Sequence, residues 1–148
     1  MIRSLEYNEV HLEFPSISCN ESFARTVVAA FLIPMDPTVE EMADIKTAVS
    51  EAVTNCIVHG YPDVVGSIEM LCRLEKHSVT ITVEDKGVGI EDIGKARTPM
   101  FTTGGAQRSG MGFTIMERFM DTLEVESIPG QGTKVVMRKE LSFGVQKD

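Results

Sequence analysis

Three polar residues, Glu51, Asn55 and His59, recur at four-residue spacing in a stretch that is otherwise rich in apolar residues. Side chains four positions apart lie on one face of a helix, so this spacing stacks a carboxylate, a carboxamide oxygen and an imidazole. A carboxylate can serve as a general base, and a carboxamide oxygen can bind Mg²⁺. Taken alone, the stretch favours the simpler interpretation, a solvated polar face on a helix that ends at Gly60.

Asp85 is a second candidate, because it ends the alternating segment 78–85 with the same parity as its inward apolar residues. A carboxylate on the core side is costly unless a hydrogen-bond donor meets it. Gly87 and Gly89 follow, and glycine lets the backbone bend sharply and approach a ligand closely. The alternative is that Asp85 caps an ordinary turn, and the pattern alone is a weak signal.

A third candidate precedes a predicted helix and consists of Arg108, Ser109, Gly110, Met111 and Gly112. Glycines at a helix N-terminus expose backbone N–H groups, and the helix dipole adds positive potential there. Such a helix start can bind phosphate. A serine cap with flexible glycines is the simpler alternative, and a lone Gly-x-Gly before a helix would not exclude it.

The first half of the chain contains the elements that would position the polar column. Alternating residues 10–14 predict a half-buried strand. Asn20 is a favourable N-cap for a helix that runs to about Ile33. Thr38 and Glu41 form a predicted capping box at the start of a long second helix, which carries the column near its end.

The second half predicts a hairpin, a long loop, a helix and a second hairpin. Residues 67–75 and 78–85 alternate on either side of a short connection, which indicates antiparallel strands. Residues 91–109 lack a regular apolar pattern, and a loop this long in a compact domain is typical of a lid over a site. A third helix is expected to run to about Met120, followed by two strands that turn at 129–132.

This order of elements predicts an α+β fold, a two-layer sandwich with helices on one face of a mostly antiparallel mixed sheet. The 148 residues suffice for one sizeable core. A single domain is therefore expected over residues 1–140, with residues 141–148 as a frayed tail.

The composition argues against several classes of function. The formal net charge of −8 does not suit a direct nucleic-acid binder, which needs clustered Lys and Arg. No apolar run approaches the ~20 residues of a membrane helix, and no N-terminal signal pattern is present. Cys19, Cys56 and Cys72 have no metal-binding spacing, which is typical of a protein of the reducing cytoplasm. A cytoplasmic protein without membrane association is expected.

Together these segments resemble the ATP-binding fold shared by DNA gyrase, the chaperone Hsp90, histidine kinases and the mismatch-repair protein MutL. Glu51–Asn55, Asp85–Gly89 and Arg108–Gly112 are similar to the motifs of that superfamily in order and spacing. Thr133, which follows a glycine in the last hairpin, matches its late strand threonine. The resemblance covers nearly the whole chain.

Within this superfamily, the chain resembles the anti-sigma factor serine kinases, and among them the sporulation type, the anti-sigma F factors. The similar segments are Asn20–Arg25, Ser50–Tyr61, Phe101–Thr103 and Arg108–Met116. Residues 104–107 are Gly-Gly-Ala-Gln, so the lid looks shorter than in such kinases and lacks a lysine there. A histidine kinase would add a dimerisation helix with a phosphorylated His, for which this chain has no room.

The resemblance implies ATP and Mg²⁺ as cofactors, ADP as the product, and a role for each motif. Asp85 would accept a hydrogen bond from the adenine amino group, and Asn55 would ligate Mg²⁺. Glu51 would be the general base or positioning group for the incoming hydroxyl, and Arg108 would reach the terminal phosphate. The further nucleotide contacts that it implies are Gly87, Gly89, Ser109, Gly110, Met111, Gly112 and Thr133.

The resemblance also implies two protein partners. One is a sigma factor, held so that it cannot engage RNA polymerase, and the other is an anti-anti-sigma protein that is phosphorylated on a serine. The expected partner surface is the first helix around Glu21, Ser22 and Arg25, and a homodimer is expected through the sheet edge near the N-terminal strand. Two alternatives stay open: an anti-sigma serine kinase of the general-stress type, and a non-catalytic binding module whose shape is set by nucleotide.

Overall fold

The structure is a computed structural model that describes residues 7–98 and 111–142. Its five strands have the order β1-β2-β3-β5-β4, and each pairing is antiparallel. The strands are β1 (Tyr7–Pro15), β2 (Ser67–Glu75), β3 (Ser78–Asp85), β4 (Thr122–Ile128) and β5 (Gly132–Glu140). The helical elements are α1 (Cys19–Leu32), the 3₁₀ turn η1 (Ile33–Met35), α2 (Val39–Asn55), the π-turn η2 (Cys56–Gly60), α3 (Ile93–Ala96) and α4 (Gly112–Phe119).

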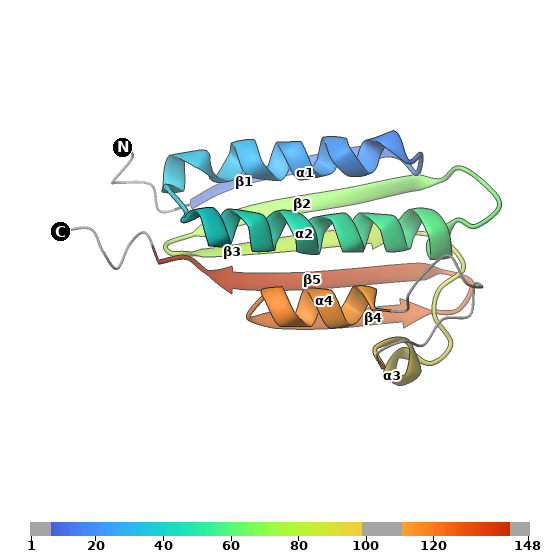
Figure 1. Cartoon of the computed structure of the whole chain (residues 1–148). Coiled ribbons are helices and arrows are strands. Elements are labelled where there is room, and N and C mark those ends of the chain that lie inside the picture. The colour runs from blue at the N-terminus through green and yellow to red at the C-terminus, as the bar shows by residue number, and fades with distance from the viewer. Residues whose placement is uncertain (1–6, 99–110, 143–148) are drawn as a thin grey trace.

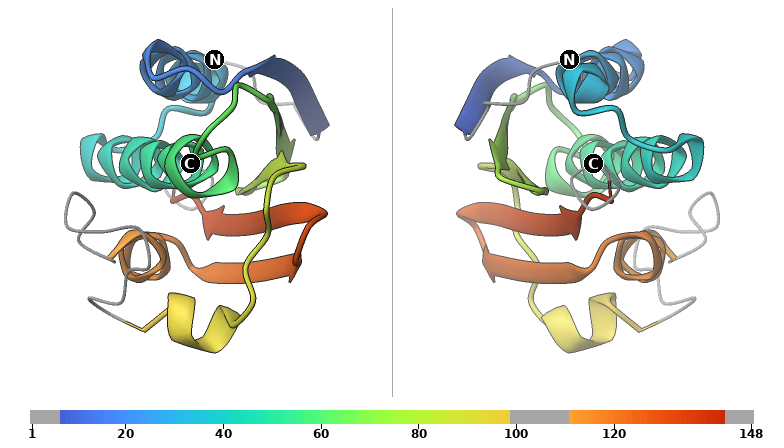
Figure 2. Two further views of the ribbon diagram at one scale, coloured as in Figure 1. Left: turned by 90° about the vertical axis from the view of Figure 1, so that its right-hand side faces the viewer. Right: turned by 90° about the vertical axis from the view of Figure 1, so that its left-hand side faces the viewer.

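Helices α1, α2 and α4 cover one face of the sheet, which confirms the expected α+β two-layer fold. They lie side by side in Figure 1, and the end-on views of Figure 2 show them on the same side of the strands. Alternating strand residues such as Ile81 pack against helix residues such as Val49, and both are fully buried. No helix in the described part of the chain is long and apolar enough to cross a membrane.

The expectation of a mixed sheet was wrong for these strands. β4 runs in the same direction as β3, because both are antiparallel to β5. β5 lies between them, so β4 has no parallel neighbour. The strand order, which depends on long-range pairing, therefore leaves every neighbouring pair of these strands antiparallel.

The two predicted helix starts had different outcomes. The capping box is confirmed, because the Glu41 N–H donates to Thr38 Oγ1 at 3.0 Å and the Thr38 N–H donates to Glu41 Oε1 at 2.9 Å. Asn20 is not the N-cap of α1, which starts after Ser18. Its side-chain amide instead donates to the Pro15 carbonyl at 2.9 Å and so closes the connection from β1.

Two segments expected to be irregular contain ordered structure. Within the predicted lid, α3 forms a single short helix, and the Asp92 side chain accepts a hydrogen bond from the Lys95 N–H. Leu141 is only 2% exposed, and Ser142 donates from its backbone N–H to Glu41 Oε2 at 2.9 Å. The first two residues of the predicted tail are therefore packed against the fold, while residues 143–148 lie outside the described part.

Candidate functional site

A cavity of about 590 Å³ lies between the end of α2, strands β3 and β5, α3 and the start of α4. Its wall includes residues from each sequence motif that the structure describes. The predicted site residues in the wall are Asn55, Asp85, Gly89, Gly112 and Thr133. Segments that are far apart in the sequence therefore meet at one cavity.

Asp85 ends β3 and is only 4% exposed, so the inward orientation predicted from its parity is confirmed. Its Oδ1 accepts a hydrogen bond from the Gly87 N–H at 2.8 Å. Burial raises the pKa of Asp85, and hydrogen bonds from the Gly87 N–H, the Cys56 thiol and the Thr133 backbone oppose this rise. A buried carboxylate at a cavity wall favours a ligand that brings a further donor.

The two glycines after Asp85 are required by close packing of the turn. A Cβ atom at Gly87 would lie 1.9 Å from the Gly60 carbonyl oxygen. Gly89 has a φ of +79°, and its Cβ would lie 2.4 Å from the Ile128 carbonyl oxygen. Close packing therefore explains why glycine is required at both positions, whether or not a ligand binds. Of the two, only Gly89 lines the cavity.

The start of α4 faces the polar column of α2. A Cβ atom at Gly112 would lie 3.1 Å from Asn55 Oδ1, which it would crowd, and 3.4 Å from Glu51 Oε1, which is an ordinary contact. The first N–H groups of a helix lack partners within it, and the helix dipole adds positive potential. An anion bound here would lie beside a carboxamide and a carboxylate, both partly exposed.

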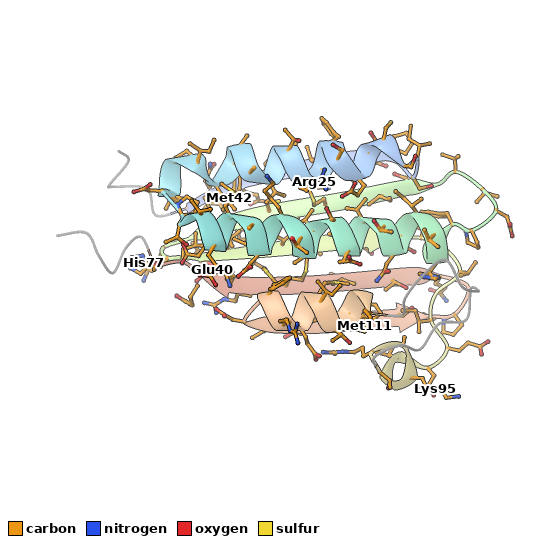
Figure 3. All side chains as sticks on the ribbon, in the orientation of Figure 1. Arg25, Glu40, Met42, His77, Lys95 and Met111 are labelled. Atoms are coloured by element: carbon orange, nitrogen blue, oxygen red, sulfur yellow. The ribbon has the colours of Figure 1, made fainter. Side chains whose placement is uncertain are left out.

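Part of the third motif can be located and part cannot. Met111 is the N-cap of α4, and Figure 3 marks it at the start of that helix. Arg108, Ser109 and Gly110 lie outside the described residues. The predicted contact of Arg108 with a terminal phosphate therefore stays a prediction.

Ser127, which the sequence analysis did not identify, bonds two residues of the cavity wall, Ile90 and Thr133. Its Oγ accepts a hydrogen bond from the Ile90 N–H at 2.7 Å and lies 2.8 Å from Thr133 Oγ1. It also donates to the Gly132 carbonyl at 2.9 Å. Ser127 has the inward parity of Leu123 and Val125, so an inward polar residue was a usable signal, as it was for Asp85.

The segment that follows α2 also contributes more than the sequence analysis foresaw. Cys56 is buried, as expected of a core residue, but its thiol also bonds Asp85. His59, which the column had singled out, lines the cavity together with Lys95 of α3. Tyr61 is only 8% exposed and bonds the turn after Asp85. Periodicity could place these residues on a helix end but could not show which loop they meet.

The expected partner surface on α1 has a bond network of its own. Arg25 pairs with Glu21 at 2.9 Å, one helical turn away. Ser50 of α2 bonds the same Glu21 carboxylate and accepts a hydrogen bond from Arg25 at 3.2 Å. Figure 3 shows Arg25 between the two helices, whereas Ser22 is exposed. Two of the three predicted partner residues are thus partly buried and linked to the residue beside Glu51.

The metal prediction can be tested against the donor set. Among residues 7–98 and 111–142, no group of three or more His, Cys, Asp or Glu side chains is placed to hold a metal ion. Mg²⁺ retains several waters and commonly takes its remaining ligands from substrate phosphates. A single Asn55 oxygen beside the α4 helix start suits an ion that is bound together with a polyphosphate.

Comparison with known sequences gives concordant matches. A family model described as the histidine kinase-like ATPase domain matches residues 20–139. A protein of Thermoanaerobacter sp. named anti-sigma F factor is 60% identical over 137 residues, which cover 91% of this chain and 96% of that protein. The anti-sigma F factor of Bacillus subtilis is 52% identical over 137 residues, covering 91% of this chain and 94% of its own.

Comparison with solved structures shows the same fold. The RsbU and RsbW domains of a Mycobacterium tuberculosis protein match with a TM-score of 0.67 at 20% identity, over 90% of this chain and 32% of that one. A blue-light activated histidine kinase from Erythrobacter litoralis matches with a TM-score of 0.55 at 26% identity, over 72% of this chain and 32% of the other.

Proposed function

Because this chain belongs to the anti-sigma F factor family and carries a histidine kinase-like ATPase domain, we propose that it is a sporulation anti-sigma factor and an ATP-dependent protein serine kinase. It binds and inhibits a sigma factor, and it phosphorylates a serine of an anti-anti-sigma antagonist. The phosphorylated antagonist no longer rebinds, so the sigma factor stays held. ADP in the site favours a complex with the unphosphorylated antagonist.

The observation that carries this proposal is the cavity itself. One wall presents the buried carboxylate of Asp85, and the other presents Asn55 beside the start of α4. The first suits a base with an exocyclic amine, and the second suits phosphates. A nucleoside triphosphate with such a base contains both the exocyclic amine and the phosphates, separated by a ribose.

Binding of ATP follows from the donors and acceptors on each wall. The adenine amino group donates to the Asp85 carboxylate and so adds a donor to a carboxylate whose burial raises its pKa. The backbone N–H groups at Gly112 and Met111 bind phosphate oxygens, together with Ser109 and Gly110. Thr133 adds a hydroxyl at the base end, where Gly87 and Gly89 keep the turn close to the ligand.

The phosphates and Mg²⁺ bind at the other wall, which is formed by Asn55 and the start of α4. Asn55 offers its oxygen to Mg²⁺, which offsets the negative charge of the phosphates when it is bound. Arg108 neutralises charge on the terminal phosphate.

Glu51 accepts the proton of the incoming serine. The serine oxygen forms a bond to the γ-phosphorus while the bond from that phosphorus to the bridging oxygen breaks, and ADP leaves. The proton of the hydroxyl passes to the Glu51 carboxylate. Glu51 lies one helical turn before Asn55, so both side chains reach the same end of the bound triphosphate.

Protein partners dock on α1 around Glu21, Ser22 and Arg25. Arg25→Glu reverses the charge and should weaken binding of both the sigma factor and the antagonist. Arg118→Glu, at an exposed position of α4, is the charge-matched control. Binding of both partners at wild-type affinity by Arg25→Glu would show that this surface is wrongly placed.

The protein acts as a homodimer in the cytoplasm, where RNA polymerase and its sigma factors work. β1 is an edge strand, and its outer backbone is available for contact with a second copy. Sedimentation of the purified chain tests this: a monomer at working concentration would contradict the dimer.

The test of the function is incubation with Mg²⁺ and γ-labelled ATP, with and without a candidate anti-anti-sigma protein. Label on a serine of that protein is the expected result. Capture of a sporulation sigma factor, rather than a general-stress one, from a panel of purified sigma factors then settles the type of pathway. Tight ATP binding without transfer to any candidate would favour a non-catalytic binding module.

A further inference from the structure

Three consecutive backbone N–H groups hold the turn after Asp85. The Lys86 N–H donates to Tyr61 Oη at 2.7 Å, and the Gly87 N–H donates to Asp85 Oδ1 at 2.8 Å. The Val88 N–H donates to the Gly60 carbonyl at 2.9 Å. Two of these three acceptors, Gly60 and Tyr61, lie at the end of η2, the π-turn that directly follows α2 and its residues Glu51 and Asn55. The base wall of the cavity, which is the turn after Asp85, is thus bonded to the segment that continues from the phosphate wall, which is Asn55 with the start of α4.

The Tyr61 hydroxyl is held from two sides. It donates to the Ser67 carbonyl at 2.7 Å while it accepts from Lys86. Its ring leaves no space at Gly66, where a Cβ atom would lie 2.2 Å from Tyr61 Cε1. Burial raises the pKa of Tyr61, so the hydroxyl keeps its proton and can donate at neutral pH.

Gly60 lies directly against the Asp85 carboxylate. A Cβ atom at Gly60 would lie 2.8 Å from Asp85 Oδ2. Oδ1 is already bonded to the Gly87 N–H, so the carboxylate cannot turn away without losing that bond. Gly60 therefore limits the space beside Asp85, and Tyr61 holds the N–H of the residue that follows Asp85. Neither residue has an assigned role in ATP binding or catalysis.

We propose that Tyr61 is a positioning residue that orients the Asp85 carboxylate and thereby sets the preference of the cavity for a purine with an exocyclic amine. The proposal rests on the proposed ATP site and deepens it. It assigns a function to the segment His59-Gly60-Tyr61, which no step of the phosphoryl transfer uses. Tyr61 acts through the Lys86 N–H and does not touch the nucleotide.

The chemistry gives a direct way to measure this preference. Inosine triphosphate has a carbonyl oxygen where ATP has the amine, so it meets Asp85 with a lone pair instead of a donor. A site built around a hydrogen bond rejects a ligand that lacks the partner group by a large factor. The ratio of ATP to inosine triphosphate affinity therefore reports the orientation of Asp85.

The experiment compares both nucleotides on wild type, Tyr61→Phe and Tyr7→Phe. The chain has two tyrosines, and Tyr7 is 50% exposed in β1, so it is the matched control. Tyr61→Phe should lower ATP affinity about tenfold, the equivalent of one lost hydrogen bond, and leave inosine triphosphate affinity unchanged. The rate of serine phosphorylation at saturating ATP should stay near that of wild type, because Glu51 and Asn55 are intact.

A second variant reaches the carboxylate without removing a hydrogen bond. Gly60→Ala should displace Asp85 Oδ2 and reduce the same affinity ratio, whereas Gly94→Ala is the control, since its Cβ would meet only an ordinary contact at 3.5 Å. Equal losses of affinity for both nucleotides in Tyr61→Phe would show that Tyr61 only supports the fold and would overturn the proposal. A wild type without preference for ATP would overturn the assigned role of Asp85 and this inference with it.

Discussion

The two walls of the cavity are built in different ways. The base wall is a buried turn, in which Asp85 is only 4% exposed and successive N–H groups bond neighbouring segments. The phosphate wall consists of Asn55 on α2 and the first residue of α4, Gly112, with Glu51 beside them, and Glu51 and Asn55 are both partly exposed. The base wall is therefore fixed by main-chain bonds, whereas the phosphate wall depends on how closely two helices approach.

This difference separates recognition from chemistry. A carboxylate that must accept one specific hydrogen bond gains from being held in a single orientation. A carboxylate that receives a proton from a protein substrate needs access, which a buried position would deny. Changes on the base wall should therefore alter which nucleotide binds, and changes on the phosphate wall should alter what the bound nucleotide does.

The largest expected effect is on the phosphate wall. Glu51→Gln removes the proposed base and should lower the rate of serine phosphorylation by about 10²–10⁴-fold, with ATP affinity retained. The measurement is transfer of label at saturating ATP, alongside a binding titration. Glu124→Gln, on an exposed position of β4, is the matched control. Phosphoryl transfer by Glu51→Gln at the wild-type rate would show that Glu51 is not the general base.

On the base wall, Asp85→Asn should weaken ATP binding by about 10–100-fold, because a hydrogen bond to a charged group contributes about 1.5–3 kcal/mol. Inosine triphosphate should lose much less. Titration calorimetry of both nucleotides measures this. A loss that is equal for the two nucleotides would mean that Asp85 does not contact the amine.

Gly112→Ala should have a smaller effect, again on the phosphate wall. Its Cβ would lie 3.1 Å from Asn55 Oδ1, so the approach of α4 to α2 must loosen by a few tenths of an ångström. Affinity for ATP should fall several-fold, on the order of 0.5–1 kcal/mol, while adenosine affinity stays the same. A parallel loss for adenosine would contradict the division into two walls.

The smallest expected effect is on the pH dependence of the free energy of unfolding, through Asp85. Burial raises the pKa of Asp85 above 3.8, so the folded chain binds this proton more readily than the unfolded chain. The stabilisation linked to that proton is present at low pH and is lost as the pH rises through the raised pKa. Relative to Asp85→Asn, the wild type should gain free energy of unfolding as the pH falls from neutral through the pKa of Asp85. Urea unfolding of both proteins across this range measures the difference.

The control for the pH series is Asp63→Asn, which removes one carboxylate from an exposed loop position. If the difference between wild type and Asp85→Asn did not change with pH, Asp85 would not titrate differently in the folded and unfolded chains. The base wall would then be less strictly desolvated than its geometry indicates.

Much of the fold could be predicted from local patterns. Period-two alternation identified β2 and β3, and the Thr38–Glu41 box identified the start of α2, because each depends on neighbouring residues only. The parity of Asp85 was enough to place a carboxylate on the inner face of the sheet. These features are properties of single elements, for which a few adjacent residues carry the information.

Most errors and omissions concern contacts between different elements of the fold. Asn20 bonds Pro15 instead of capping α1, and Ser142 bonds Glu41 across the fold. Ser127 had a readable parity, but its bond to Ile90 depends on the fold. No local pattern reports such partners, because they are set by which elements pack together.

The sequence by itself determined the chemistry of this protein: a polar column at helical spacing, an inward aspartate before two glycines, and a glycine-rich helix start, in an order shared with its family. Only the tertiary structure decided that Gly60 and Tyr61, after α2, bond the turn after Asp85, and that Gly112 lies against Asn55 and Glu51. Periodicity records which face of an element is buried, whereas the distance between two elements depends on packing and hydrogen bonds from the whole chain.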